Sequence, residues 1–268
     1  MRILGLLTAA AVFSAAWTPS HSEETRPNPL EPSATWDAIQ FDVVGDVELR
    51  DGTDLYTLEA PFRAMDAALV PIRFTQMDGA PDVRRLLLVV DENPAPIAAE
   101  FSFGAAMQPV DLETRVRVDA YTDIRAIIET TDGEHYMAGR FVRAAGGCSA
   151  PAAKDAAEAL ASLGQMKVRW FDGGDADGRR DVQVMLRHPN YSGLQRDPLT
   201  LLSIPAHFVD NLEVRQGDEL LFTMAAGISI SEDPTFRFKY SDRASGNIDV
   251  RATDTDGGTF ERSFPAGS

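Results

Sequence analysis

The sequence has one cysteine, few basic residues and no long apolar run beyond its first segment. The single cysteine, Cys148, excludes a disulfide within the chain. Lys and Arg total 25 against 41 Asp and Glu, a formal net charge of −16. Such an acidic surface argues against nucleic acids and anionic membranes as partners, because both bind basic surfaces. A hydrophobic fraction of 44% is typical of an ordinary folded protein.

The first residues are typical of a secretory signal peptide. Arg2 gives a positive start, residues 3–13 form an apolar run, and small residues up to Ala16 follow. The run is shorter than the about 20 residues that a membrane-spanning helix needs. We therefore expect residues 1–22 to be a signal peptide and the mature chain to be periplasmic. Loss of Arg2 would make its charge −17, which is 24 minus 41.

Alternating apolar and polar residues predict strands through most of the chain. Residues 236–240 show the pattern most plainly, with Phe236, Phe238 and Tyr240 on one face and two basic residues on the other. The predicted strands cover residues 41–49, 69–74, 83–90, 97–101, 112–118, 124–129, 136–143, 166–171, 182–187, 207–214, 219–224, 236–240, 248–252 and 259–264. Asp-Gly pairs between several of these runs indicate turns.

This pattern predicts an all-β fold with two immunoglobulin-like β-sandwich domains. We expect a flexible segment over residues 23–34, a first sandwich over 35–145 and a second over 165–268. Residues 146–164 would form an arm that carries the cysteine, followed by a linker helix.

Two short stretches are expected to be helical. Residues 35–39 can form one turn with Trp36 as its apolar anchor. Residues 151–163 are rich in alanine, leucine, lysine and glutamate and have no β-branched residue, which favours a helix that Gly164 would end.

Cys148 follows two glycines and precedes Ser149, Ala150 and a proline. Gly146 and Gly147 free the backbone, and a helix starting just afterwards would lower the thiol pKa through its positive end. The sequence therefore predicts an accessible, moderately activated nucleophile. Most unpaired cysteines are instead small apolar fillers, but this glycine-rich segment would make a poor core.

The stretch Gly146-Gly147-Cys148 after an all-β domain resembles the carrier arm of the SoxYZ sulfur-oxidation carriers. Residues 186–189 and 204–209 resemble segments of the SoxZ subunit. The mature chain looks like SoxY fused to SoxZ, and it is most similar to the SoxYZ-like carriers associated with quinoprotein dehydrogenases. Here Ser149 and the predicted helix tether the cysteine on both sides, which shortens its reach.

The resemblance implies a carrier rather than an enzyme, with no cofactor. Cys148 would be the covalent attachment site for a sulfur-containing group, and Gly146 and Gly147 would be the hinge. Its partners would be periplasmic enzymes that transform sulfur compounds or accompany a quinoprotein dehydrogenase. An exposed thiol could also join two copies as a disulfide-linked homodimer.

Two other functions remain open. The chain could be an accessory or docking module of a periplasmic quinoprotein dehydrogenase system, with Cys148 dispensable. It could also be a copper or other metal chaperone, although His135, His188 and His207 show no metal-ligand spacing with one another. Residues 172–178 resemble part of a calcium loop, but the alignment puts Gly173 at position one and Val184 at position twelve, where an acidic residue is required.

Overall fold

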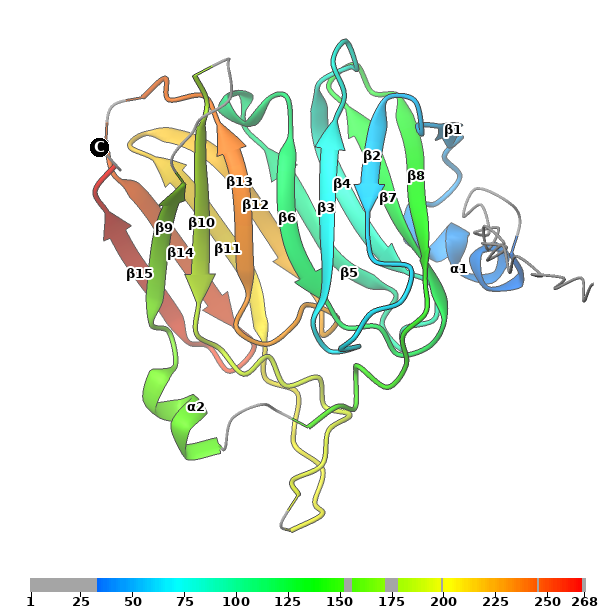
Figure 1. Ribbon diagram of the computed structural model, residues 1–268, viewed down its shortest axis with the longest axis vertical. Coiled ribbons are helices and arrows are strands. Elements are labelled where there is room, and N and C mark those ends of the chain that lie inside the picture. The colour runs from blue at the N-terminus through cyan, green and yellow to red at the C-terminus, as the bar shows by residue number, and fades with distance from the viewer. Residues whose placement is uncertain (1–32, 152–155, 172–177, 199, 245, 267–268) are drawn as a thin grey trace, which may run out of the picture.

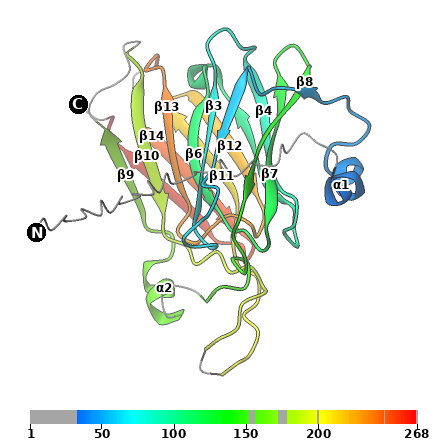
Figure 2. The same cartoon turned by 45° about the vertical axis from the view of Figure 1, so that its right-hand side comes forward.

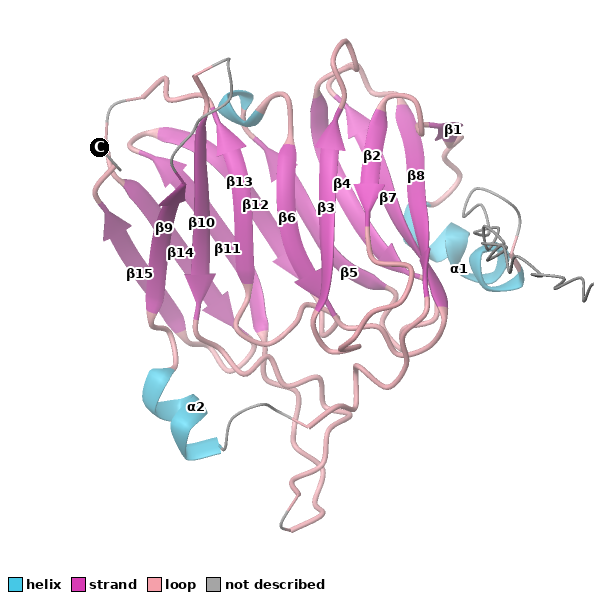
Figure 3. Cartoon of the chain, in the orientation of Figure 1, coloured by secondary structure: helices cyan, strands magenta, loops and turns pink. Residues whose placement is uncertain are grey.

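The computed structural model describes residues 33–151, 156–171, 178–198, 200–244 and 246–266, which fold into two facing β-sheets (Figures 1 and 3). Over these residues, one sheet has nine strands in the order β1 (Arg50–Asp51), β8 (His135–Val142), β7 (Thr122–Thr130), β4 (Val83–Val90), β5 (Ile97–Phe103), β12 (Glu219–Ala226), β11 (Val209–Gln216), β14 (Ile248–Asp254) and β15 (Thr259–Phe264). The other has six, in the order β2 (Tyr56–Glu59), β3 (Val70–Gln76), β6 (Asp111–Val116), β13 (Thr235–Tyr240), β10 (Arg180–Leu186) and β9 (Met166–Phe171). The helices are α1 (Ala34–Val44), a 3-10 turn (Ala105–Met107) and α2 (Ala156–Ser162).

The all-β prediction is confirmed, and its strands after residue 50 match the observed ones to within two residues at each end. In β13, Phe236, Phe238 and Tyr240 are buried as the alternation predicted. The short strand β2 was not predicted. It pairs with β3 at the edge of the smaller sheet.

The two halves of the chain share both sheets. β5 of the first half pairs with β12 of the second, and β6 pairs with β13. Phe101 packs against Phe222 and Phe236 across this junction, with ring centroids 6.2 Å apart in each pair. One apolar core therefore extends through both halves. The two immunoglobulin-like β domains are fused side by side, and they are not separate bodies joined only by a hinge.

Gly104 permits the close approach of the two halves at one point. Its N–H donates to the carbonyl oxygen of Leu221 at 2.7 Å. A Cβ on residue 104 would lie 1.9 Å from the carbonyl oxygen of Leu220, which no side chain tolerates. The junction therefore depends on the absence of a side chain at this position.

The helix α1 packs on the outer face of the nine-stranded sheet, beside β7 and β8 (Figures 1 and 2). Ser33 caps it by accepting a hydrogen bond from the N–H of Trp36. Trp36 is buried against Leu87 and its neighbours on the sheet. The guanidinium carbon of Arg125 lies 4.4 Å from the Trp36 ring centroid, a cation–π distance. The predicted helical turn around Trp36 is thus confirmed and longer than expected.

The predicted strand over residues 41–49 is wrong. Residues 41–44 form the last turn of α1, which ends at Gly45 with a φ of 70°. Ile39 and Val43 pack with Trp36 onto the sheet. Packing of this apolar face therefore overrides the strand propensity of the β-branched residues, which depends strongly on context.

Several expectations fall on other parts of the chain. The signal peptide over residues 1–22, most of the segment 23–34 and all but the last residue of the loop 172–178 lie outside the described residues. Among the residues that are described, no helix is both long enough and apolar enough to cross a membrane.

Candidate functional site

The segment after β8 crosses one end of the sandwich on its way to α2, at the lower end in Figures 1 and 2. Cys148 lies in a turn within this segment, and its exposure is 0%. Gly147 is also buried, whereas Gly146 and Ser149 are exposed. The expectation of an accessible thiol is therefore wrong for this conformation, because the second domain covers the cysteine. We call residues 143–151 the arm.

The two glycines of the arm have different structural roles. Gly147 lies so close to the first domain that a Cβ would be 2.0 Å from the Ala67 carbonyl oxygen and 2.7 Å from that of Val118. Gly146 has open space around it but a φ of 78°, which favours glycine. The N–H of Gly147 donates to the carbonyl oxygen of Val118, and the N–H of Gly146 donates to that of Asp119. Both glycines are thus needed to form this turn.

Polar side chains from both domains hold the arm by its backbone. The N–H of Cys148 donates to Asp119 Oδ1 at 3.3 Å. From the second domain, Ser192 Oγ donates to the carbonyl oxygen of Cys148, and Gln195 Nε2 donates to that of Ala150 at 2.8 Å. The arm is therefore clamped between domains by contacts to the backbone on both sides of the cysteine.

The thiol is held in its protonated form. The pKa of Cys148 is raised to about 11, mainly by burial and also by the charge of Asp119, and Arg117 opposes part of this rise. The expected lowering by a helix end is wrong. Pro151 is not helical, and within the described residues α2 begins only at Ala156.

Arg117 is the residue beside the arm that sequence reasoning missed. Alternation placed it on the outer face of a strand, but β6 ends at Val116 and Arg117 is only 1% exposed. Its N–H donates to the carbonyl oxygen of Ser229, so a loop of the second domain covers it. Its Nη1 and Nη2 donate to the carbonyl oxygens of Gly147 and Asn190, each at 3.2 Å. Burial lowers the pKa of its guanidinium. No local sequence pattern predicts the burial of Arg117, because the loop around Ser229 that covers it is distant in the sequence.

The segments around His188 and His207 meet on the carboxylate of Asp254. Asp254 Oδ2 lies 3.3 Å from His188 Nε2 and 2.8 Å from His207 Nε2. His188 is fully buried, and its pKa is lowered by burial and by the nearby His207. These are the histidines of the two segments that resemble SoxZ. The structure brings them together although their spacing did not predict it.

These three side chains have the ligand types of a metal site, but the hydrogen bonds fit an imidazole cluster better. His188 Nδ1 accepts from the backbone N–H of Asn190 at 3.0 Å. The neutral ring must then carry its proton on Nε2, the atom that faces Asp254. A metal-bound histidine needs the opposite arrangement, with its second nitrogen donating. Cys148 is not among the described residues that gather here.

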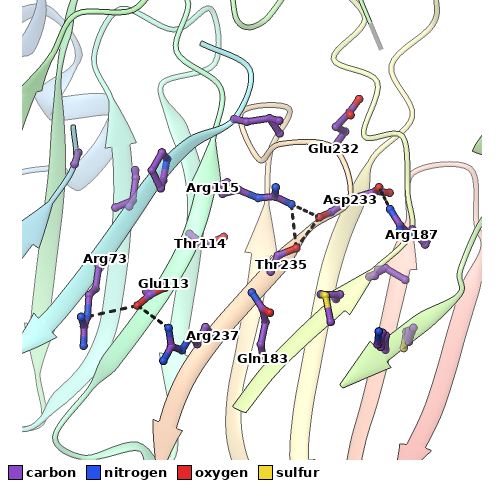
Figure 4. Close-up of a pocket in the computed structure, with 18 of the residues that line it drawn as sticks. Arg73, Glu113, Thr114, Arg115, Gln183, Arg187, Glu232, Asp233, Thr235 and Arg237 are labelled. Carbon is purple, nitrogen blue, oxygen red and sulfur yellow. Dashed lines mark hydrogen bonds and ion pairs between the residues drawn. The ribbon is translucent and has the colours of Figure 1, made fainter. Parts of the chain in front are cut away.

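A pocket of about 1030 Å³ crosses the outer face of the six-stranded sheet where the two domains join (Figure 4). Arg73 and Arg237, which line it, make their shortest ion pairs with Asp111 and Asp181, each at 2.8 Å. Glu113 lies between Arg73 and Arg237, with closest distances of 3.8 and 3.9 Å, and Arg187 pairs with Asp233. Asp233 and Ser229, whose carbonyl oxygen accepts from the N–H of Arg117, lie in the same connection between β12 and β13.

Similarity to solved structures is low. A superoxide reductase (neelaredoxin) variant from Ignicoccus hospitalis has a TM-score of 0.30 at 12% identity, covering 40% of this chain and 90% of that chain. A β-glycosidase from Bacteroides vulgatus has a TM-score of 0.25 at 7% identity, covering 79% of this chain and 24% of its own. No curated protein matches the sequence.

Family models match both halves of the chain. The model for the sulfur oxidation protein SoxY matches residues 41–148, and its match ends on the single cysteine. The model for the sulphur oxidation protein SoxZ matches residues 167–265. SoxY carries sulfur on a cysteine, and the two proteins form the carrier of the periplasmic sulfur oxidation system. The chain is therefore a fusion of a SoxY domain and a SoxZ domain and belongs to the family of sulfur oxidation carriers.

Proposed function

We propose that this chain is a periplasmic carrier that binds a sulfur-containing group covalently on Cys148 and presents it to partner enzymes. The observation that supports it most is the position of the thiol. The SoxY match ends on Cys148, the single cysteine of the chain, and this residue lies in an irregular segment between the two domains.

The described conformation fits the closed state of such a carrier. A protonated, buried thiol is protected from the oxidants of an exported environment. The backbone of the arm accepts or donates four hydrogen bonds with the side chains of Arg117, Asp119, Ser192 and Gln195. The N–H groups of Gly146 and Gly147 make two more bonds, to backbone carbonyl oxygens. At about 0.5–1.5 kcal/mol each, releasing these six bonds costs about 3–9 kcal/mol. The arm can therefore open without unfolding the core.

Opening would be local. Gly146 is exposed, and a Cβ added to it would meet no atom within 4 Å, so its backbone can rotate once Gly147 leaves its site. In this proposal Gly146 and Gly147 are the hinge, and the partner is an enzyme of sulfur oxidation or of a quinoprotein dehydrogenase system. A disulfide-linked homodimer through Cys148 would require the same opening.

The test is to identify what Cys148 carries. The chain is expressed with residues 1–22 in a sulfur-oxidising host, isolated from the periplasm without reductant and measured by intact mass. We expect mass additions on Cys148 that dithiothreitol removes and that Cys148→Ser lacks. A thiol that is always unmodified in cells growing on reduced sulfur compounds would contradict the proposal.

The burial of Cys148 favours a second candidate, an accessory or docking module in which the thiol is idle. The same variant separates the two. If Cys148→Ser supports growth on the sulfur substrate as well as the parent chain does, the docking function is the correct one. If growth is lost while the variant stays folded, the carrier function holds.

A third candidate, the copper or metal chaperone, is opposed by the proton on His188 Nε2. Metal analysis of the purified chain after incubation with Cu⁺ or Zn²⁺ tests it. A stoichiometric ion that is lost in His207→Gln would favour the chaperone.

A further inference from the structure

Arg117 is buried, and within the described residues no carboxylate forms a direct ion pair with it. Both hydrogen bonds of its guanidinium go to neutral carbonyl oxygens, those of Gly147 and Asn190. Its Nε is buried and has no hydrogen-bond partner. Among the residues that the structure describes, none places a carboxylate oxygen at salt-bridge distance from this side chain. Glu232 and Asp66 attract it only at longer range, and burial still lowers its pKa. A buried cation without a direct ion pair is costly and calls for a reason.

The guanidinium lies beside the cysteine. Nη1 binds the carbonyl oxygen of the residue before Cys148, and the charge of Arg117 is close enough to favour the thiolate. A guanidinium has five N–H donors in a planar fork, which suits the oxygens of an anion. At least one of these donors, Nε–H, is free here.

We propose that Arg117 binds the negatively charged end of a group carried on Cys148. This inference rests on the proposed carrier function and deepens it, because it assigns the charge of the cargo and the residue that recognises it. An anionic adduct would accept a hydrogen bond from the free Nε–H and place a negative charge in direct contact with the guanidinium. A cationic or uncharged group would bring no negative charge to the guanidinium.

Neighbouring acidic groups restrict where the anion can lie. Asp119 accepts a hydrogen bond from the N–H of Cys148, and its charge raises the pKa of the Cys148 thiol. It would therefore repel a negative group attached to this sulfur. Asp66 and Glu232 attract the charge of Arg117, but its guanidinium donates to backbone carbonyl oxygens and to none of these three carboxylates. The side of Cys148 that faces Arg117 is therefore the favourable one.

Two thiol reagents of matched size and opposite charge provide the test. Sulfonatoethyl and trimethylammonioethyl methanethiosulfonate both react with a thiolate. The thiolate attacks the reagent sulfur that is bonded to the ethyl carbon and to the sulfonyl group. A new S–S bond forms and the S–SO₂ bond breaks, with its electron pair leaving as methanesulfinate. The thiolate sulfur is oxidised and the sulfonyl sulfur is reduced, so no other oxidant is needed. The adducts differ only in the charge at their end.

The measured quantity is the ratio of the labelling rate by the anionic reagent to that by the cationic one. We expect this ratio to fall about tenfold or more in Arg117→Gln, since a hydrogen bond to a charged group contributes about 1.5–3 kcal/mol. Arg117→Lys should keep most of the ratio. The control Arg251→Gln removes one charge from an exposed ion pair with Glu261 and should leave the ratio unchanged. A ratio within a factor of two of the parent in Arg117→Gln would overturn the proposal.

A second measurement needs no substitution at position 117. The parent chain is loaded fully with each reagent, and the two adducts are compared by thermal unfolding. We expect the anionic adduct to have the higher Tm. Equal values, or a higher Tm for the cationic adduct, would also refute the role of Arg117. Because both reagents are artificial, this result does not depend on whether the cell loads Cys148, which the periplasmic mass measurement decides separately.

Discussion

The Ser192 hydroxyl donates a hydrogen bond to the carbonyl oxygen of Cys148, so the second domain holds the arm at its cysteine. Ser192 Oγ also accepts from the N–H of Leu194, and the N–H of Ser192 donates to Gln195 Oε1. These residues form the base of a hairpin closed by the bridge between Tyr191 and His207. The SoxZ domain therefore controls access to a thiol that belongs to the SoxY domain.

Ser192→Ala should open the arm more often. Loss of a net contribution of about 0.5–1.5 kcal/mol predicts alkylation of Cys148 by iodoacetamide that is about two to ten times faster. The rate is measured by mass spectrometry at a fixed pH. Ser162→Ala is the matched control, because its hydroxyl bonds only within α2. Equal rates in both variants would mean that Ser192 does not hold the arm.

The buried thiol should make stability fall at alkaline pH. The pKa of Cys148 is raised from 9.0 to about 11 in the folded chain, so between these values the folded state holds the proton that the unfolded state releases. This contribution is complete below pH 9.0 and is lost as the pH rises to about 11, by about 2–3 kcal/mol. Urea unfolding of the parent and of Cys148→Ser across this range measures it. Parallel curves for the two proteins would contradict the raised pKa.

Asp119→Asn should lower the thiol pKa while keeping an acceptor for the N–H of Cys148. The carboxylate is the second cause of the raised pKa after burial. The chemical shift of the labelled Cβ of the single cysteine gives the titration directly. An unchanged midpoint would show that burial alone sets the pKa.

The two glycines of the arm should respond differently to alanine. Gly147→Ala places a methyl group against the carbonyl oxygens of Ala67 and Val118, whereas Gly146→Ala meets open space and only an unfavourable φ. We expect about 1–2 kcal/mol of destabilisation for Gly146→Ala and more for Gly147→Ala. Gly147→Ala should also speed alkylation of Cys148, because the turn can no longer pack closely against the first domain and cover the thiol. If Gly146→Ala has the larger effect on alkylation, rotation at Gly146 rather than packing at Gly147 limits opening.

Acid should destabilise the chain through His188. Its pKa is lowered from 6.5 by burial and by His207, so the folded state resists protonation. Its contribution to stability is complete above pH 6.5 and is lost as the pH falls from there through the folded pKa. His188→Gln keeps a donor toward Asp254 and should remove most of this dependence in thermal unfolding. The pKa of Asp254 is lowered by hydrogen bonds despite its burial, so its contribution to stability is lost only as the pH falls below 3.8.

The sequence predicted the strands and the position of the arm but not the closure of the site. The alternation over residues 236–240 reflects which side chains of one strand are buried. It therefore predicted both β13 and the residues on its buried face. The pairing of β5 with β12 joins residues that are far apart in the chain, and no local pattern encodes it. The covered state of Cys148 was missed for the same reason. Ser192 and Gln195 contact the arm from positions more than 40 residues away.

The strands that cross the boundary between the domains limit the distance over which a sulfur group can be handed on. Because β5–β12 and β6–β13 fix the domains to each other, only the arm itself can travel. Arg143 is anchored by its N–H to the carbonyl oxygen of Phe62, and five residues of extended chain span at most about 18 Å. An enzyme whose catalytic centre lies deeper than this below its surface could not be served by Cys148.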